Sequence, residues 1–249
     1  MEWILNRYQG KEAVVLAQVR RCTEDDLDAV YGLQEYVRSR MEKPEVFLPD
    51  EREELCRMLQ TGLCVGVFVA QALVGFLLLS YCGEDEHNYA SVLDIPRSEW
   101  KYWANADSAA VHPDYRGNRL QQRMLKLAEE WRDPAIIGLA ATVSPQNRYS
   151  LDNVLACGFS VAKRCEMYGG HDRYVLQKRL LPLAGQYRHF KGNPYQVLYL
   201  AKDSETTQPV VVYRALYGER EIWVRPAAMW FEHVERDGYS GPRFVYSAE

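Results

Sequence analysis

The sequence has no hydrophobic run long enough to span a bilayer, because its longest apolar stretch, around residues 73–79, is far too short. Its beginning, MEWILNRYQGKE, also lacks the basic leader and apolar core of a secretion signal. We therefore expect a cytoplasmic protein without a membrane segment. Acidic and basic residues nearly balance, at a net charge of −4, which argues against attraction to nucleic acid or anionic lipid as the main activity.

Metal-binding and disulfide patterns are absent as well. The six cysteines contain no C-x-x-C pair, and the five histidines do not lie beside them at metal-ligand spacing. We therefore predict no metal site, and reduced thiols that behave as small, mostly buried apolar groups. The cysteines are Cys22, Cys56, Cys64, Cys82, Cys157 and Cys165.

The first half of the chain alternates in its apolar periodicity. The 249 residues, 47% hydrophobic and 26% charged, are enough for one large domain or for one medium and one small domain. The apolar spacing predicts a strand at 13–20, amphipathic helices at 23–40 and 49–60, and a β-hairpin over 64–81. The acidic and aromatic stretch at 83–103 predicts a loop with a short helical turn, and loops of this length tend to be functional.

The next segments continue the alternation. A small-residue strand at 106–111 precedes a helix, a buried strand at 135–143 precedes a second helix at 147–159, and two strands close the region around Gly169 and Gly170. Strand, helix, strand and helix followed by antiparallel strands predict a mixed α/β (α+β) fold.

The pattern changes at residues 181–186. Beyond this point short strands rich in aromatic residues replace the helices. We predict two domains, residues 1–180 and a small β-rich domain at 181–249. A domain this small needs large apolar residues in its core, which favours core positions for its aromatics over a surface that stacks nucleic-acid bases.

The stretch VHPDYRGNRLQQRML, residues 111–125, predicts a strand that turns and enters a helix. Gly117 allows a sharp turn, Asn118 is a plausible N-cap, and Gln121 occupies the capping-box position. Free amides at such a helix start bind anions, above all phosphate, and Arg116 and Arg119 add positive charge. The alternative is an ordinary strand-to-helix turn with solvated arginines.

Residues 13–180 resemble a GCN5-related N-acetyltransferase (GNAT), a family that moves an acyl group from acyl-CoA to an amine. VHPDYRGNRLQQRML is similar to the pyrophosphate-binding motif of the family, and TVSPQNRYSLDNVLACGF is similar to a later motif in which an asparagine precedes Gly-Phe. The resemblance implies a GNAT acyltransferase fold with acetyl-CoA as co-substrate.

The resemblance also implies roles for individual residues. The pyrophosphate would be held by the amides of Arg116, Gly117, Asn118, Arg119, Leu120 and Gln121. Backbone groups of Ala109, Ala110 and Val111 would pair with the pantetheine arm, and one of their amides would stabilise the oxyanion of the tetrahedral intermediate. Asn147 would hydrogen-bond the arm from the other side.

The sequence departs from the family in three places. Arg119 stands where the family usually has glycine, and Gln121 where it has glycine or alanine. Val154 replaces a tyrosine that often protonates the departing thiol. A thiol pKa of about 8.5 makes the thiolate a tolerable leaving group, so this loss should slow transfer without abolishing it. Three other tyrosines could reach the sulfur or be simple packing residues: Tyr149, Tyr102 and Tyr168.

Asp107 is our first choice for the base that takes the proton of the amine, because family catalytic acids often lie at the start of this strand. The alternative is a solvated carboxylate at a strand end. An acidic cluster, Glu84, Asp85 and Glu86 with His87, could instead attract a cationic substrate. The segment YGGHDRY at 168–174 also recurs in bacterial members of the family, without an assigned role.

Residues 185–244 resemble DUF1653, a small bacterial domain of unknown function, through segments such as YRHFKG, VVYR and WVRP. This second resemblance identifies a module and no activity. The acetyltransferase resemblance implies an N-acetyltransferase for a primary amine, either a small molecule or a protein lysine or N-terminus. The alternative is a non-catalytic protein that binds acyl-CoA or a partner. A homodimer is left open, and the balanced charge argues against nucleic acid as a partner.

Overall fold

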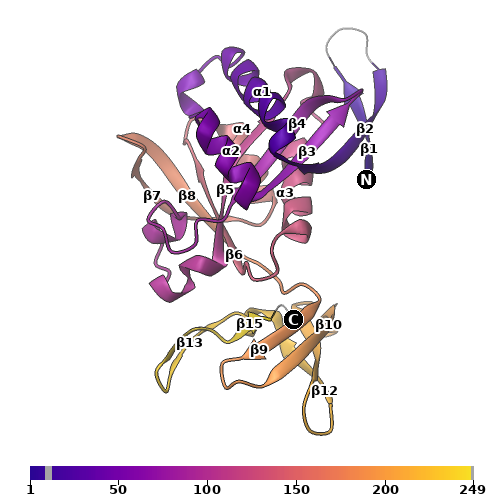
Figure 1. Ribbon diagram of the computed structural model, residues 1–249, viewed down its shortest axis with the longest axis vertical. Helices are drawn as coiled ribbons and strands as arrows, with labels where there is room; N and C mark the ends of the chain where they lie inside the picture. The colour runs from indigo at the N-terminus through magenta and orange to yellow at the C-terminus, as the bar shows by residue number, and fades with distance from the viewer. Residues whose placement is uncertain (9–12, 248–249) are drawn as a thin grey trace.

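The computed structural model describes residues 1–8 and 13–247, which form a large and a small sheet joined at residues 180–184 (Figure 1). The strands of the large sheet, in the order β1-β2-β3-β4-β5-β6-β8-β7, are β1 (Glu2–Arg7), β2 (Ala13–Cys22), β3 (Leu63–Val69), β4 (Ala72–Ser80), β5 (Trp103–Val111), β6 (Gly138–Val143), β7 (Ser160–Met167) and β8 (His171–Arg179). The helices are α1 (Leu27–Ser39), α2 (Arg52–Thr61), α3 (Leu120–Trp131) and α4 (Arg148–Ala156). Short 3-10 turns include η3 (Tyr89–Val92) and η4 (Arg97–Tyr102).

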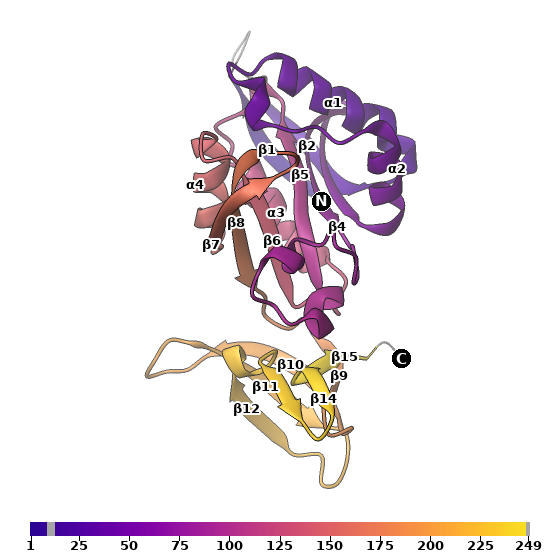
Figure 2. The ribbon, with the colours of Figure 1, turned by 90° about the vertical axis from the view of Figure 1, so that its left-hand side faces the viewer.

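Helices cover both faces of the large sheet, with α1 and α2 on one side and α3 and α4 on the other (Figure 2). Successive side chains of a strand point to opposite faces, so one strand supplies both cores. Leu77 of β4 belongs to the core with Met124 of α3, whereas its neighbour Leu78 belongs to the core with Leu55 of α2. This arrangement confirms the mixed α/β fold predicted for the N-terminal part.

The predicted hairpin over 64–81 is confirmed as β3 and β4. Its turn residues Ala70 and Gln71 both have positive φ, 47° and 70°, as a tight two-residue turn requires. In contrast, the apolar pattern does not predict β1, which pairs with β2 at the edge of the sheet. Ile4 and Leu16 lie opposite each other and are both exposed, so this pair lacks the polar outer face that identifies a strand.

β5 is the strand that shapes the site. It pairs with β6 only as far as Ala106, so its edge facing β6 carries no strand partner from there to Val111. On the other side, Leu78 and Leu79 of β4 pair with the residues flanking Asp107, which itself has no residue opposite. Asp107 is therefore the extra residue of a β-bulge, a feature that redirects a side chain locally.

The C-terminal part is all β, as predicted. Its main sheet has the order β12-β11-β10-β9-β15, and β13 and β14 form a separate pair. The strands are β9 (Gly185–His189), β10 (Pro194–Lys202), β11 (Pro209–Ala215), β12 (Ile222–Pro226), β13 (His233–Arg236), β14 (Tyr239–Pro242) and β15 (Phe244–Tyr246). The rings of Trp230 and Phe244 stack at 3.9 Å, and Tyr187 meets Trp230 edge-on, so these aromatics form the core.

Buried contacts cross between the two sheets. Trp103 of β5 and Tyr187 of β9 belong to one cluster of buried apolar residues. Beside it, the fully buried carboxylate of Glu99 accepts a hydrogen bond from Arg179 at 2.7 Å and lies 2.7 Å from Nδ1 of His233. The C-terminal part is therefore held against the large sheet by apolar packing and by the contact between Glu99 and His233.

None of the helices within residues 1–8 and 13–247 is long and apolar enough to cross a membrane. The six cysteines are free thiols there, three of them buried and three partly buried. In the same part of the chain, no group of three or more histidine, cysteine, aspartate or glutamate side chains is placed to hold a metal ion.

Candidate active site

The loop before α3 contains two residues with left-handed backbone. Gly117 has a φ of 86°, and a Cβ at this position would lie 3.1 Å from the ring of Tyr8. Arg119, with a φ of 54°, is the N-cap of α3. This conformation favours glycine, so Arg119 adopts a backbone shape that glycine would take more easily. In addition, the side chain of Arg119 places a guanidinium group at this loop.

The capping box predicted for Asn118 and Gln121 is wrong. The side chain of Asn118 accepts a hydrogen bond from the amide of Asn6 at 2.8 Å and donates one to its carbonyl at 2.7 Å. Gln121 instead donates to Ser150 and accepts from Asn153, both in α4. Both side chains hold the loop to neighbouring elements, and the partner of Asn118 is in β1, the strand that the sequence did not predict.

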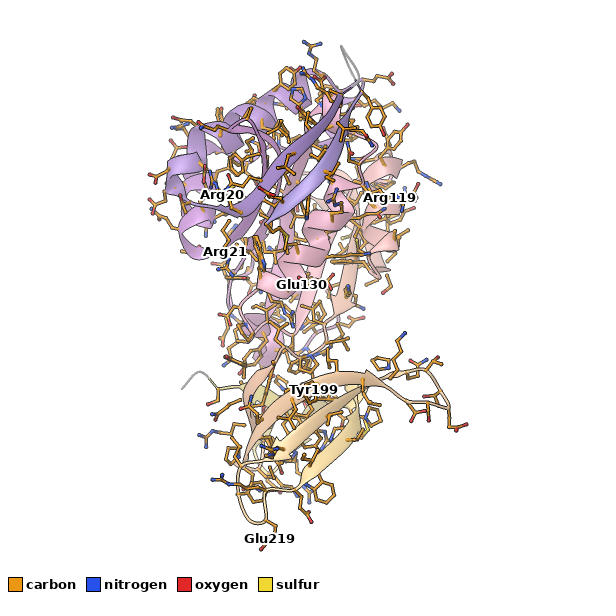
Figure 3. The ribbon with its side chains drawn as sticks, turned by 90° about the vertical axis from the view of Figure 1, so that its right-hand side faces the viewer. Arg20, Arg21, Arg119, Glu130, Tyr199 and Glu219 are labelled. Carbon is orange, nitrogen blue, oxygen red and sulfur yellow. The ribbon has the colours of Figure 1, made fainter. Side chains whose placement is uncertain are left out.

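Open backbone amides lie at the start of α3. Its first internal bond joins the amide of Arg123 to the carbonyl of Arg119, and in the described residues none of the amides of 117–122 donates to another protein group. The amide of Arg116 donates to the Pro113 carbonyl, so Arg116 would contribute its side chain instead. Arg119 projects from this end of α3 (Figure 3). Open amides with nearby cations fit a pyrophosphate.

A cavity of about 1350 Å³ connects this loop to Asp107. Of the predicted cofactor residues, all except Asn118 line it: Ala109, Ala110, Val111, Arg116, Gly117, Arg119, Leu120, Gln121 and Asn147. The unpaired edge of β5 lies along it. The part around Asp107 includes Asp50, Ser80, Tyr89, Thr142, Tyr168 and Arg173. An extended ligand could therefore contact the loop and the carboxylate at once.

Asp107 lies at the end of a chain of hydroxyl groups. Its Oδ2 accepts a hydrogen bond from Ser80 at 2.6 Å, and its Oδ1 accepts one from Tyr89 at 2.5 Å. The hydroxyl of Tyr168 donates to that of Tyr89 at 2.7 Å and lies 2.9 Å from the hydroxyl of Thr142. Because Tyr168 uses its proton on Tyr89, Thr142 is the donor to Tyr168. All the donors in this chain therefore point toward the carboxylate.

Burial changes the acid–base properties of this group. It raises the pKa of Asp107, although the hydrogen bonds from Ser80 and Tyr89 oppose the change by favouring the charged form. Burial also raises the pKa of the Tyr89 phenol well above its usual range, so this hydroxyl keeps its proton at neutral pH. A carboxylate with a raised pKa is a better proton acceptor than a solvated one.

Asp50 is a second candidate base, which sequence reasoning missed. Its main chain is held by the buried side chain of Gln34, which donates to its carbonyl at 2.8 Å and accepts from its amide at 3.1 Å. Oδ2 of Asp50 is buried without a hydrogen-bond partner among the described residues. Burial and the negative charge of Asp107 raise the pKa of Asp50 to about 7. Such a group gains and loses a proton at neutral pH.

The other predicted residues are divided between the cavity and the surface. Tyr149 and Tyr168 line the cavity, as does the buried Val154, whereas Tyr102 does not. Of the acidic cluster, Glu86 and His87 line the cavity. Two of its acids already have cationic partners, since Glu84 lies 3.8 Å from Lys101 and Glu86 lies 3.8 Å from Arg97. Their charges are therefore partly neutralised.

Sequence reasoning missed most of the residues that surround Asp107. Ser80 and Tyr89 lie in a strand end and in the long loop, where neither has a distinctive spacing. Arg173 is the one missed residue with a sequence signal, because it belongs to the recurring segment YGGHDRY together with Tyr168. In the structure, Tyr168 and Arg173 of that segment both line the cavity.

Comparison with known proteins separates the two parts of the chain. A candidate acetyltransferase from Salmonella typhimurium with its cofactor acetyl-CoA is 15% identical, with a TM-score of 0.50, over 68% of this chain and 96% of that one. An acetyltransferase of the GNAT family from Streptococcus pneumoniae is 16% identical, with a TM-score of 0.48, over 66% and 99%. The N-terminal part has the GNAT fold. No curated protein matches the chain.

Residues 185–246 match the model of a family described as a protein of unknown function, DUF1653. A solved DUF1653 protein from Bordetella bronchiseptica is 39% identical, with a TM-score of 0.25, over 26% of this chain and 86% of that one. The match falls on the C-terminal sheets and does not overlap the cavity, whose lining ends at Arg173.

Proposed function

We propose that this chain is an N-acetyltransferase. Its N-terminal part has the GNAT fold, and its residues 185–246 belong to the DUF1653 family. The reaction would transfer the acetyl group of acetyl-CoA to a primary amine. One observation carries this proposal: a single cavity is lined both by the loop with open amides before α3 and by the partly buried Asp107. The loop could thus hold the co-substrate, and Asp107 could take the proton of the acceptor amine.

The residues of the loop and of β5 would bind and orient the co-substrate, which supplies its acetyl group as a thioester. The amides of 117–122, with Arg116 and Arg119, suit its pyrophosphate. The unpaired edge of β5 at Ala109–Val111 offers backbone groups to its pantetheine arm, and Asn147 lies across the cavity. An amide of this edge would stabilise the oxyanion that forms as the amine attacks.

Asp107 would accept the proton that the amine loses as its nitrogen bonds to the carbonyl carbon and the carbon–sulfur bond breaks. Both carboxylate oxygens already accept hydrogen bonds from hydroxyls, which fix the position of the side chain. Above about pH 7, where it is ionised, Asp50 would add negative charge and attract the ammonium form of the acceptor, which has to lose a proton before its nitrogen can attack. General-base assistance of this kind contributes about 10²–10⁴ in rate.

The departing thiolate would leave without help from position 154, because valine has no proton to donate. Tyr168 lies in the cavity, but its proton is used on Tyr89. Once Asp107 is protonated, the hydroxyl chain through Tyr89 and Tyr168 can reverse and present a proton at Thr142. We therefore assign Tyr168 to this chain and regard unassisted departure as the ordinary route.

The test is to incubate the full chain with acetyl-CoA and a panel of primary amines and to measure the free thiol released. Amine-dependent release that falls at least 100-fold in Asp107→Asn would support the proposal. The non-catalytic alternative, an acyl-CoA-binding protein, predicts calorimetric binding of acetyl-CoA with no thiol release for any amine. Absence of acetyl-CoA binding would contradict both functions.

A further inference from the structure

Arg173 is a buried cation without an anionic partner. It lies in β8, is 5% exposed and lines the cavity. Its one hydrogen bond among the described residues runs from Nη1 to the carbonyl of Val46, at 3.1 Å. Nε is buried without a partner, and no carboxylate of that part of the chain lies within 4.0 Å. One edge of the guanidinium, Nε and Nη2, is therefore unused.

An unpaired buried guanidinium is unfavourable, because it loses its water without gaining a charge partner. Burial accordingly lowers the pKa of Arg173. The other buried arginine of the described residues, Arg132, is satisfied, because it donates to three carbonyl groups. Arg173 thus differs from Arg132, because it lines a cavity and its Nε lacks a protein acceptor.

Arg173 lies at the Asp107 end of the cavity. Its guanidinium carbon is 5.5 Å from the centroid of the Tyr168 ring, and the hydroxyl of Tyr168 leads through Tyr89 to Asp107. The carbonyl it contacts, that of Val46, belongs to the same α1–α2 connection as Asp50. Two carboxyl groups and one cation without an anionic partner therefore lie at the same end of the cavity.

Building on the proposed acetyltransferase function, we infer that the acceptor is a small amine that also carries a carboxylate, with its amine at Asp107 and its carboxylate at Arg173. Nε and Nη2 of a guanidinium match the two oxygens of a carboxylate, and such paired hydrogen bonds are strong. A monoamine would leave Arg173 unpaired, and a polyamine would place a second positive charge near it. An amino acid satisfies both ends of this site.

The experiment compares each common L-amino acid with its carboxamide as acceptor, at saturating acetyl-CoA, by the thiol released. We expect at least one amino acid to exceed its amide at least tenfold in kcat/KM. Arg173→Gln should lower this ratio of kcat/KM between acid and amide at least tenfold, and Arg173→Lys should restore part of the ratio. The control is Arg164→Gln, an exposed arginine of β7 paired with Asp172, which removes the same charge and should keep the preference.

Calorimetry of the same compounds on the protein saturated with CoA separates this inference from the proposed function. Acid-selective binding that Arg173→Gln removes, without turnover of any amine, would support the carboxylate site and contradict acetyl transfer. Turnover of amines with no preference for acids over amides would overturn the carboxylate site and leave the enzyme assignment standing. The wild-type comparison needs no variant, so a poorly folding Arg173→Gln does not prevent a decision. If the protein neither binds nor turns over any of these compounds, both the carboxylate site and the acetyltransferase function are overturned.

Discussion

The hydroxyl of Tyr89 lies 2.5 Å from Oδ1 of Asp107, so a residue of the long loop directly contacts the bulged residue of β5. The contact orients the carboxylate toward the cavity and stabilises its charged form. Burial acts in the opposite direction and raises the pKa of Asp107. The balance gives a base that is fixed in place and still able to take a proton.

Asp107→Asn should lower the acetylation rate by about 10²–10⁴, because the amide cannot accept the proton of the amine. The pH profile should change as well. In the wild type we expect kcat to rise with pH through the pKa of the base and then to level off. In the variant the rate should continue to rise toward the pKa of the acceptor, about 10 for a lysine-like amine. A variant with unchanged rate and pH profile would show that Asp107 is not the base.

Tyr89→Phe removes the hydrogen bond and keeps the ring. We expect a smaller loss than for Asp107→Asn, about tenfold in kcat, because the carboxylate remains but is no longer fixed on one side. The acidic limb of the pH–rate profile should shift to higher pH, since losing this hydrogen bond further raises the pKa of Asp107. Tyr102→Phe is the matched control, because Tyr102 lies outside the cavity lining. An equal loss in both variants would argue against a role for the Tyr89 hydroxyl.

Arg119→Glu should weaken acetyl-CoA binding at least tenfold, about 1.4 kcal/mol, because an attractive charge at the α3 amides becomes a repulsive one. Isothermal titration calorimetry measures the change. Lys126→Glu, an exposed residue further along α3, makes the same change of charge away from the cavity. If both variants bind equally well, the loop at Arg119 does not hold the pyrophosphate.

The order and type of most elements could be predicted from the sequence, because amphipathic periodicity and turn residues are local signals. The hairpin at β3 and β4 and the helix after Gly117 are examples. β1 could not be predicted, because its apolar side chains such as Ile4 face outward. The capping of α3 depends on the contact between Asn118 and β1, which are far apart in the sequence.

The candidate site was predictable only in part, for a similar reason. The loop at 116–121 has a spacing that can be read locally, whereas Asp107 was predicted only from the family resemblance. Asp50 and Arg173 become functional candidates only when burial deprives them of partners, which is a property of the folded chain. Tyr89 likewise depends on the β-bulge that turns Asp107 toward it.

Asp50→Asn should change the pH dependence of stability. The carboxyl of Asp50 keeps its proton in the folded state up to about pH 7, whereas in the unfolded chain it ionises near 3.9. The wild-type free energy of unfolding therefore falls relative to the variant as pH rises from about 4 to 7, by at most about 1.4 kcal/mol per pH unit. Above pH 7 the difference stays constant.

Chemical denaturation of both proteins at pH 4.5 and pH 7.5 measures this change. Asp25→Asn is the matched control, since Asp25 is exposed to solvent and the chemical substitution is the same. The stability difference between Asp50→Asn and the wild type should grow in favour of the variant at the higher pH. A difference that does not vary with pH would mean that the Asp50 carboxyl ionises normally in the folded protein.

Ending the chain at Leu181 tests the proposed division into residues 1–180 and 181–249. The cavity lining ends at Arg173, so we expect acetyl-CoA affinity and the KM of the acceptor to stay within about twofold of the full chain. Stability should fall, because Trp103 loses its buried neighbour Tyr187 and Glu99 loses His233. Differential scanning calorimetry should show a lower Tm. An insoluble product would mean that the shared cluster is part of one core, and that residues 1–180 are not an independent domain.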